Sequence, residues 1–299
     1  MSVAAKLLEL GVAVDANGPA EQRVPCPRCD RGPRDDAMGA NIETGVLHCF
    51  RCGWSGRAGS GDTHAGGGIV RIDDPRRAER VRKRLRDIWH TTVPLGEEAA
   101  RAVQTYLHAR GLGQVLLSPP AVLRAHPALA YFDTTGRELG KWPAMVALFA
   151  NRDGDRCTVH ATYLRADGSA KAPVANPKKV LGVPARGATK GGAIRLYQPQ
   201  VGRLGIAEGI ESALSLGLIR RIPVWSSYCA DNLVTVRLPP RLRELEIGVD
   251  VDDNHKGEAA ARALAARVLR NRPGLTVRLI MPDGDGPRDL NDELQPRPG

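Results

Sequence analysis

The chain of 299 residues carries 43 Lys and Arg against 33 Asp and Glu, which gives a formal net charge of +10 and a pI near 9.6. A balance this basic points to nucleic acid, an anionic membrane surface or a polyanionic substrate as the partner. Aromatic residues make up only 4% of the chain, which argues against extensive base stacking on aromatic platforms.

The N-terminal segment, MSVAAKLLELGVAV, contains one Lys and has Glu9 inside a short apolar run. This pattern predicts a short amphipathic helix rather than a signal peptide. No stretch approaches the roughly 20 apolar residues of a membrane span. We therefore expect a soluble, cytoplasmic protein with no membrane partner. In that compartment, paired cysteines are more often metal ligands than disulfides.

Two CxxC pairs, CPRC and CFRC, are separated by 19 residues in the N-terminal region. This spacing is typical of a zinc site. Four thiolates complete a closed, tetrahedral shell, so the sequence predicts a structural Zn²⁺ site. Its ligands would be Cys26, Cys29, Cys49 and Cys52.

Several arginines and two aromatic residues surround these cysteines. Cations paired with aromatic rings suit single-stranded DNA, through phosphate pairing and base stacking. Arg51 and Trp54 are therefore candidate nucleic-acid contacts. The alternative for Trp54 is packing within the zinc ribbon.

A glycine-rich stretch, RAGSGDTHAGGG, follows the cysteines and predicts a linker. Residues 76–90 place Val81, Leu85, Ile88 and Trp89 at helical spacing, with a strongly basic opposite face. A second helix is expected over about residues 97–110.

From residue 131 to 200 we expect short strands joined by turns, including 142–149 and 157–164. From residue 201 the pattern changes to strands that alternate with helices, which predicts a parallel sheet. The expected strands are 203–209, 222–227, 244–250 and 275–282, and the main helices are 210–219 and 257–270.

Acidic residues stand at the ends of two of these strands. Glu208 ends RLGIAEG, and Asp250 ends LEIGVD. The carboxyl ends of parallel strands meet at one edge, so we expect both acids there, with Asp252 on the same side. Carboxylates without nearby His or Cys select Mg²⁺ or Mn²⁺. Asp289 and Asp292, after the last strand, are further candidates.

AEGIESALS followed by VDVDDNHKG resembles the Toprim signature, a Glu after one strand and an Asp-x-Asp after a later one. The order of Cys₄ ribbon, middle region and Toprim domain is similar to that of the phage and plasmid zinc-binding primases, relatives of the bacterial replicative primase. VHATYLRADGSAKAPVANPKKVLG and GGAIRLY resemble the basic half of a primase core. The resemblance covers nearly the whole chain, and the ribbon and the acidic pattern are its specific parts.

The resemblance implies that Glu208, Asp250 and Asp252 are the catalytic, metal-binding acids, with Asp289 as a further metal ligand. Glu208 would be a metal ligand or the general base, and the sequence does not separate these roles. An alternative register pairs Asp252 with Asn254 and loses one acid.

Two features depart from the family pattern. The first knuckle of the bacterial form usually contains a His where this chain has Cys29. The gap from Asp250 to Gly257 is also longer than the usual D-x-D-x-x-G.

The implied fold class is α+β with α/β. We expect a zinc-ribbon DNA-binding domain at 1–56, a linker at 57–70, the basic mixed α/β subdomain of a primase core at 71–200, the catalytic Toprim domain with its parallel sheet at 201–294, and a tail at 295–299.

The implied function is that of a DNA primase, a DNA-directed RNA polymerase and nucleotidyltransferase. It would make short RNA primers on a single-stranded DNA template from ribonucleoside triphosphates, in DNA replication beside a separate helicase. If a phage encodes the chain, it would act in the host cytoplasm. Candidate contacts to phosphates of the template or nucleotide are Arg165, Lys171, Lys178 and Lys179.

Two other functions remain open. One is another Toprim enzyme, a topoisomerase or nuclease, and the other is a non-catalytic zinc-ribbon replication factor that binds DNA. Residues 182–192, GVPARGATKGG, resemble a phosphate-binding loop, but Lys190 does not directly follow the second glycine as that motif requires. We therefore predict an ordinary loop there.

Overall fold

The computed structural model describes residues 2–29, 36–49, 54–58, 75–133, 136–185, 187–200, 202–253, 255–284 and 286–295. Arg51, Cys52 and most of the predicted linker at 57–70 lie outside these ranges. The chain divides into two compact units. The first unit comprises Met1–Arg71 with Ala130–Lys141, and the second comprises Ile72–Leu129 with Trp142–Gly299. None of the helices in the described ranges has the length and apolarity needed to cross a membrane.

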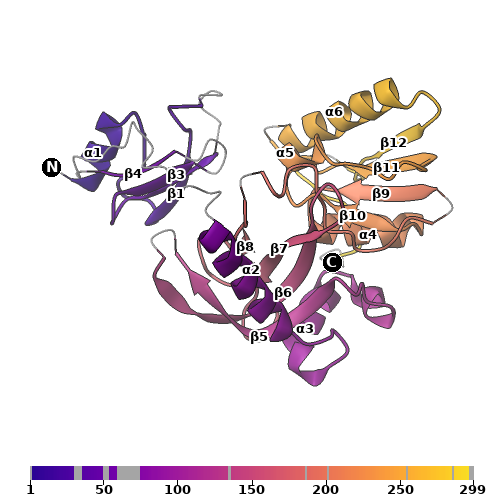
Figure 1. Ribbon diagram of the computed structural model, residues 1–299, viewed down its shortest axis with the longest axis horizontal. Coiled ribbons are helices and arrows are strands. Elements are labelled where there is room, and N and C mark those ends of the chain that lie inside the picture. Colours follow the sequence, from indigo (N-terminus) through magenta and orange to yellow (C-terminus); the bar gives the residue numbers. More distant parts are fainter. Residues whose placement is uncertain are drawn as a thin grey trace. The chain divides into compact units, whose positions relative to one another are not determined.

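The first unit contains a short helix and a small antiparallel sheet (Figure 1). Helix α1 (Val3–Glu9) begins at Ser2, whose hydroxyl accepts a hydrogen bond from the Ala5 N–H and so satisfies one free donor of the first turn. The predicted N-terminal helix is confirmed. The sheet has the order β1 (Glu21–Val24), β2 (Met38–Asn41), β3 (Val46–Cys49) and β4 (Ser55–Arg57).

A second antiparallel sheet follows along the chain, in the order β5 (Leu123–Phe132), β6 (Glu138–Ala150), β7 (Arg156–Tyr163) and β8 (Lys178–Val180). The expectation of short strands starting at residue 131 was wrong in two respects. Strand β5 starts at Leu123, and β6 has 13 residues. Pro127 lies inside β5, and a proline normally argues against a strand because it cannot donate a ladder hydrogen bond.

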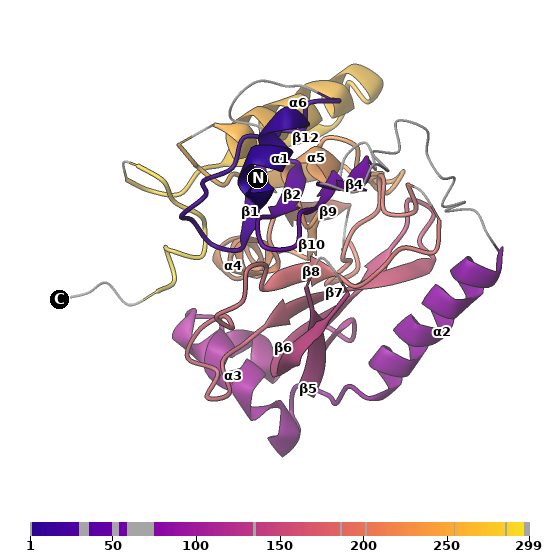
Figure 2. The ribbon, with the colours of Figure 1, turned by 90° about the vertical axis from the view of Figure 1, so that its left-hand side faces the viewer.

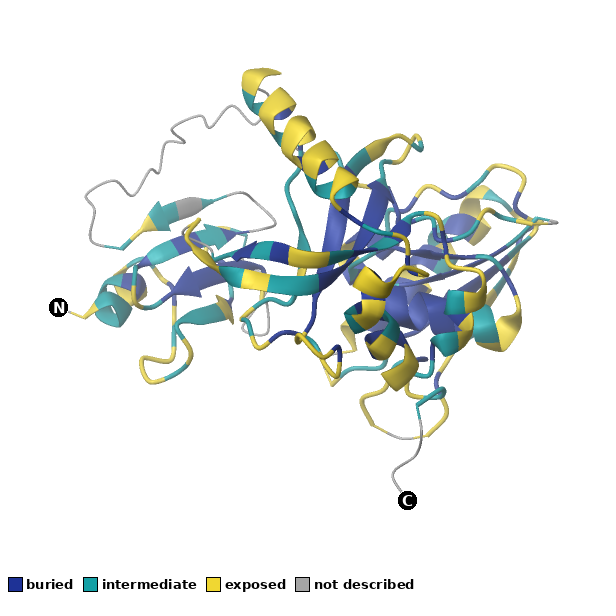
Figure 3. Ribbon diagram, turned by 90° about the horizontal axis from the view of Figure 1, so that it is seen from below, coloured by how far each residue is buried: buried dark blue, intermediate teal, exposed yellow. Residues whose placement is uncertain are grey.

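Helix α2 (Pro75–His90) confirms the predicted basic helix, but it buries little of its surface. Leu85 and Ala78 are its buried residues, while Val81, Ile88 and Trp89 are half-buried. Most of the helix is exposed (Figure 3). A short 3-10 helix, η1 (Glu98–Ala100), leads into α3 (Arg101–Ala109), and η2 (Gly113–Leu117) follows.

The C-terminal sheet is parallel, as predicted, with the order β10 (Val224–Ser226), β9 (Arg203–Ala207), β11 (Glu244–Gly248) and β12 (Thr276–Ile280). Three helices accompany it: α4 (Ile210–Arg220), α5 (Ala230–Leu233) and α6 (Lys256–Asn271). The short helix α5 was not predicted.

Alternation along β9 decides which helix covers which face of this sheet. Leu204 and Ile206 pack in a core with residues of α5 and α6. Gly205 points to the other face, where a Cβ atom would lie only 2.9 Å from Leu216 of α4. Helices α5 and α6 therefore lie on one face and α4 on the other (Figure 2).

Within the second unit, residues 193 and 194 join the two sheets. Ala193 bridges to Ala150 of β6, and Ile194 bridges to Ser226 of β10. The buried side chain of Asn232 on α5 holds the preceding loop. It accepts from the Gly191 N–H at 2.9 Å and donates to the Gly192 carbonyl at 2.8 Å. These contacts position the middle sheet beside β10, the outer strand of the parallel sheet. The boundaries expected at 70/71 and 200/201 remain predictions.

Candidate carboxylate metal site

Glu208 and Asp250 stand at one edge of the parallel sheet. Strands β9 and β11 are neighbours, with Ile206 opposite Ile247, and each acid follows the end of its strand by one or two residues. A pocket of about 360 Å³ opens at this edge. Its carboxylates are Glu208, Asp250, Asp252, Asp289 and Asp292. The expected gathering of these acids is therefore what the fold produces.

The segment after β12 returns to this edge. Val251 and Arg288 exchange two backbone hydrogen bonds of 2.7 Å, which carries Asp289 next to Asp250. Asn291 anchors the segment, because its buried amide donates to the Arg110 carbonyl at 2.7 Å and to Ser215 Oγ at 3.1 Å. Asp289 thus reaches the pocket through contacts distant in sequence.

Burial and mutual repulsion make charge unfavourable in this pocket. Burial, together with the nearby charges of Glu208 and Asp289, raises the pKa of Asp250 to about 7. Burial is also the main cause that raises the pKa values of Glu208 and Asp289. A divalent cation would relieve both effects.

One oxygen of Asp250 points to the same conclusion. Asp250 Oδ1 is buried and has no hydrogen-bond partner among the described residues. A buried acceptor left without a donor is costly unless another group satisfies it. A hard cation such as Mg²⁺ or Mn²⁺ fits an all-oxygen donor set of this kind. Asp250, Asp252, Glu208 and Asp289 are the residues that could hold it.

The carboxylates are nevertheless not drawn into a tight cluster. Among the described residues, the one group of three or more potential ligands with all ligand atoms within 4.8 Å is formed by cysteines. The acidic edge therefore provides ligands for a metal without a preformed, closed shell.

The start of α6 fixes the second acid and the backbone of the first. Asp252 Oδ1 accepts a hydrogen bond of 2.9 Å from the Lys256 N–H. Gly257 packs so closely that a Cβ atom there would lie 2.2 Å from the Asp250 carbonyl oxygen. The glycine thus contacts the first acid despite the longer spacing noted in the sequence. Asn254, which the alternative register pairs with Asp252, lies outside the described residues.

A buried glutamate near the site, Glu211, was not predicted from the sequence. Glu211, in the first turn of α4, accepts a hydrogen bond of 2.7 Å from the Tyr106 hydroxyl and pairs with Lys178 at 3.2 Å. Burial alone would raise the pKa of Glu211, but the charges of Lys178 and Lys171 and the Tyr106 hydrogen bond bring it below its ordinary value. The signal was an acid in an otherwise apolar helix, IESALSLGL.

The four predicted phosphate contacts separate into two groups. Lys178 and Lys171 lie near Glu211, whose charge is the main cause of the raised pKa of Lys178. Burial, followed by the charge of Lys178, lowers the pKa of Lys171. Arg165 is exposed in a turn after β7, and Lys179 follows Lys178 on β8, where successive side chains point to opposite faces. None of the four lines the carboxylate pocket.

The cysteine site lies in the first unit. Sulfur atoms of Cys26, Cys29 and Cys49 all lie within 4.8 Å of one another, with Cys29 and Cys49 at 3.6 Å. Cys52 and Arg51 fall outside the described residues. Trp54 is half-buried against the core of this unit, and the Arg28 guanidinium lies 5.3 Å from its ring centroid.

Raising the pH should destabilise the protein in the absence of added Mg²⁺ or Mn²⁺. The pKa of Asp250 rises from 3.8 to about 7 on folding, so the folded state binds more protons in this interval and stability falls as pH rises through it. We expect the thermal unfolding midpoint to drop by a few degrees between about pH 5 and pH 8. Asp250→Asn should remove most of that drop, and an unchanged drop in this variant would contradict the assignment.

Gly257→Ala should disturb the acidic edge. The added methyl group would collide with the Asp250 carbonyl, and we expect a loss of about 1–3 kcal/mol in the free energy of unfolding. Mn²⁺ affinity, measured by calorimetry, should fall as well. Gly274→Ala is the matched control, because a Cβ atom there meets nothing within 4 Å. Equal Mn²⁺ binding by both variants would show that the contact does not position Asp250.

Two family models match the chain in comparisons with known proteins. A family model described as a Toprim domain matches residues 203–297, and one described as a domain of unknown function (DUF7146) matches residues 79–191. No curated protein matches the chain.

Among solved structures, the chain is similar to the E. coli primase catalytic core (16% identity, 72% of this chain and 75% of that one, TM-score 0.47). It is also similar to the zinc-binding and RNA polymerase domains of the Aquifex aeolicus primase (15%, 98% and 79%, 0.40). A third similar structure is the primase fragment of the bacteriophage T7 primase-helicase protein (14%, 90% and 92%, 0.37). The predicted resemblance is confirmed in its Toprim part: residues 203–297, which supply all five carboxylates of the pocket, match the Toprim domain model.

Proposed function

We propose that the protein is a DNA primase, which synthesises short RNA primers on single-stranded DNA by metal-dependent nucleotidyl transfer. The observation that carries this proposal is the carboxylate pocket at the edge of a Toprim sheet, with one buried Asp250 oxygen that has no hydrogen-bond partner in the part of the chain that the structure describes. Such a donor set suits divalent cations that act on phosphate groups. The chain's net charge of +10 suits the polyanionic template.

In this reaction the 3′-hydroxyl of the growing primer attacks the α-phosphorus of an incoming ribonucleoside triphosphate, and pyrophosphate leaves. Mg²⁺ or Mn²⁺, when bound by Asp250, Asp252, Glu208 and Asp289, would neutralise charge on the reacting phosphate oxygens. The protein's own part is to hold these acids apart at the edge of a rigid sheet.

Lys178 and Lys171 supply positive charge beside the acids. The charge of Glu211 raises the pKa of Lys178 and so favours its protonated form. The ion pair also holds the lysine in place, because the Glu211 side chain is only 4% exposed and is therefore shielded from water. Lys178 would then contact the triphosphate of the nucleotide. Arg165 and Lys179, with Arg51 and Trp54 of the first unit, are proposed contacts to the template. A separate helicase would supply the single strand.

The burial of the tyrosine side chains argues against a topoisomerase, because that enzyme uses a tyrosine hydroxyl as its nucleophile. All five tyrosines are described, and none is exposed. The Tyr106 hydroxyl donates to Glu211, the Tyr197 hydroxyl donates to the Ser118 carbonyl, and Tyr228 packs edge-on against Phe149 with centroids 5.2 Å apart. Burial is the first cause that raises the pKa values of Tyr106, Tyr197 and Tyr228, which disfavours the phenolate.

Primer synthesis tests the proposal directly. The native chain, given labelled ribonucleotides, mixed-sequence single-stranded DNA and Mg²⁺ or Mn²⁺, should make short RNA. Asp250→Ala/Asp252→Ala should lower the yield by about 100-fold or more, because the main metal ligands are gone. Asp253→Ala is the matched control, since Asp253 is exposed and does not line the pocket.

Equal RNA yield from the native chain and the double variant would move the metal site elsewhere. RNA synthesis by neither, with tight DNA binding by both, would favour the non-catalytic DNA-binding function. A covalent protein–DNA adduct would instead favour a topoisomerase.

We also propose that the cysteines bind one structural Zn²⁺. Three thiols of suitable proximity belong to one small core, and the fourth CxxC cysteine, Cys52, would complete the shell. The ribbon so formed would contact the template. In this unit, four short strands and a two-turn helix supply little apolar core, so metal ligation would contribute much of the folding free energy.

Zinc content tests this second proposal. The purified native protein should contain one zinc per chain by atomic emission, and Cys26→Ser should lose most of it together with the cooperative unfolding of the first unit. Cys157→Ser, which changes a cysteine of the middle sheet, should retain the metal. Full zinc occupancy in Cys26→Ser would overturn the assignment.

A further inference from the structure

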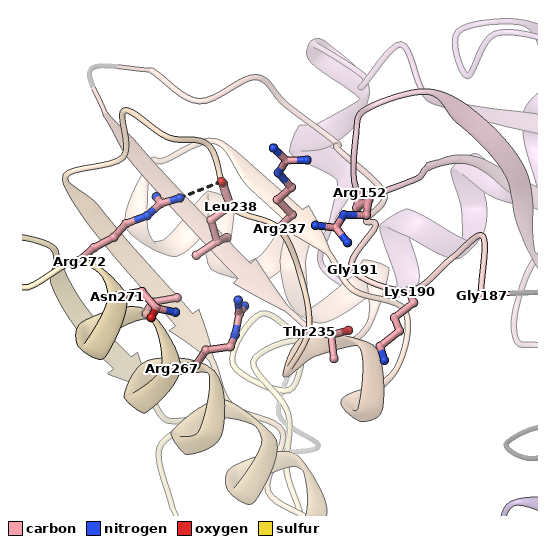
Figure 4. Close-up of a pocket in the computed structure, with 11 residues that line it drawn as sticks. Arg152, Gly187, Lys190, Gly191, Thr235, Arg237, Leu238, Arg267, Asn271 and Arg272 are labelled. Atoms are coloured by element: carbon pink, nitrogen blue, oxygen red, sulfur yellow. Dashed lines mark hydrogen bonds between the residues drawn. The ribbon is translucent and has the colours of Figure 1, made fainter.

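A second pocket, of about 520 Å³, lies beside the C-terminal end of α6 (Figure 4). It is lined by five cationic side chains and by no carboxylate. They come from three parts of the second unit: the β6–β7 turn, the loop around residue 190, and the region from the end of α5 to the end of α6. The cations are Arg152, Lys190, Arg237, Arg267 and Arg272.

This basic pocket is distinct from the carboxylate pocket. Helix α6 starts at Lys256, whose N–H binds Asp252 of the acidic edge. Arg267 lies eleven residues further along the helix, which corresponds to roughly 16 Å of rise. The two pockets share no lining residue. They therefore occupy opposite ends of the same helix.

Two of the five cations are held by backbone carbonyls. Arg272 donates to the Pro239 and Leu238 carbonyls at 2.6 and 3.2 Å. Arg267 donates through Nη2 to the Val236 carbonyl at 2.6 Å, while its buried Nε has no hydrogen-bond partner among the described residues. Arg272 is thus a structural clamp on the loop before β11, and Arg267 keeps an unused donor.

The other three cations, Arg152, Lys190 and Arg237, are not held by backbone carbonyls. Within the described ranges, the side chains of Arg152 and Lys190 have no hydrogen-bond or ion-pair partner. Arg237 pairs with Asp153 at 2.5 Å, but both side chains are more than half exposed, so water and salt weaken this pair. In Figure 4 the guanidinium groups of Arg152 and Arg267 extend into the space between the loop and α6.

The positive charges of this pocket repel one another, and a bound anion would offset that repulsion. Burial, followed by the nearby charge of Arg272, lowers the pKa of Arg267. Guanidinium groups bind phosphate oxygens through two parallel hydrogen bonds, a geometry that a single-atom anion such as chloride cannot use. Several cations from different elements around one hollow suit adjacent phosphates better than a single one.

We propose that this basic pocket is a second phosphate-binding site, which takes adjacent phosphate groups of a nucleic-acid strand or of a nucleotide. Its core is Arg152, Lys190, Arg237 and Arg267, while Arg272 holds the loop. Lys190 belongs to the segment that superficially resembles a phosphate-binding loop. Strand β8 precedes this segment, but the next described element is strand β9 and not the helix that such a loop leads into. The site does not depend on nucleotidyl transfer.

Binding without added divalent metal tests this site separately from primer synthesis. Arg152→Glu/Lys190→Glu reverses two unpaired charges and should leave the fold intact, as judged by thermal unfolding. We expect it to weaken binding of a dye-labelled oligothymidylate, followed by fluorescence anisotropy, about 10-fold or more. The salt dependence of log affinity should become shallower by about 1.4, for two lost phosphate contacts. In parallel, calorimetry measures binding of inorganic tripolyphosphate.

Arg101→Glu/Arg241→Glu is the matched control, because it makes the same charge change at exposed positions outside both pockets. Loss of oligothymidylate binding specific to the pocket variant supports a strand backbone as the ligand, and specific loss of tripolyphosphate binding supports a nucleotide. The proposal is overturned if the native chain binds neither probe, if the pocket variant binds both as the native chain does, or if the control loses as much.

Discussion

Burial of carboxylates at the ends of two neighbouring parallel strands is the constraint on which the candidate site depends. Strands β9 and β11 pair in register, so Glu208 and Asp250 must emerge at one edge. Burial there raises the pKa values of both acids. The fold keeps them in place through local donors, including Ser212 beside Asp250 and the Ala230 N–H beside Glu208. A cation is the natural partner for such an edge.

The middle sheet reaches this edge through a buried polar contact rather than through apolar packing alone. Tyr106 comes from α3, Lys178 from β8 and Glu211 from α4, so one glutamate ties together three elements distant in sequence. The cost of burying its charge is offset by two lysines and a hydroxyl. The same contact holds a cation beside the acids, where phosphate groups would need one.

Helix α6 separates two regions of opposite charge. Its N-terminal end binds an Asp252 oxygen, and its C-terminal end carries Arg267 and faces the basic pocket. Both arrangements follow the helix dipole, which favours acids at the start and cations at the end. The net charge of +10 is therefore unevenly distributed, and an anionic partner would meet separate cationic and metal-binding surfaces.

The sequence by itself determined the order of elements, the parallel sheet, the CxxC pairs and the acids at strand ends. These follow from local periodicity and from short spacings, which the chain carries wherever it folds. Its predictions failed or fell short where long-range contacts decide. Strand β5 contains a proline, and β6 begins at Glu138, four residues before the apolar stretch that signalled it, so local signals underestimated both.

Tertiary structure alone decided which charged residues act together. Asp289 reaches Asp250 through the Val251–Arg288 bridge, and Glu211 becomes a buried anchor through partners more than 30 residues away in sequence. The basic pocket collects Arg152 and Arg267 from elements that no spacing connects. Electrostatic interactions depend on distance in space and on burial, and a sequence records neither.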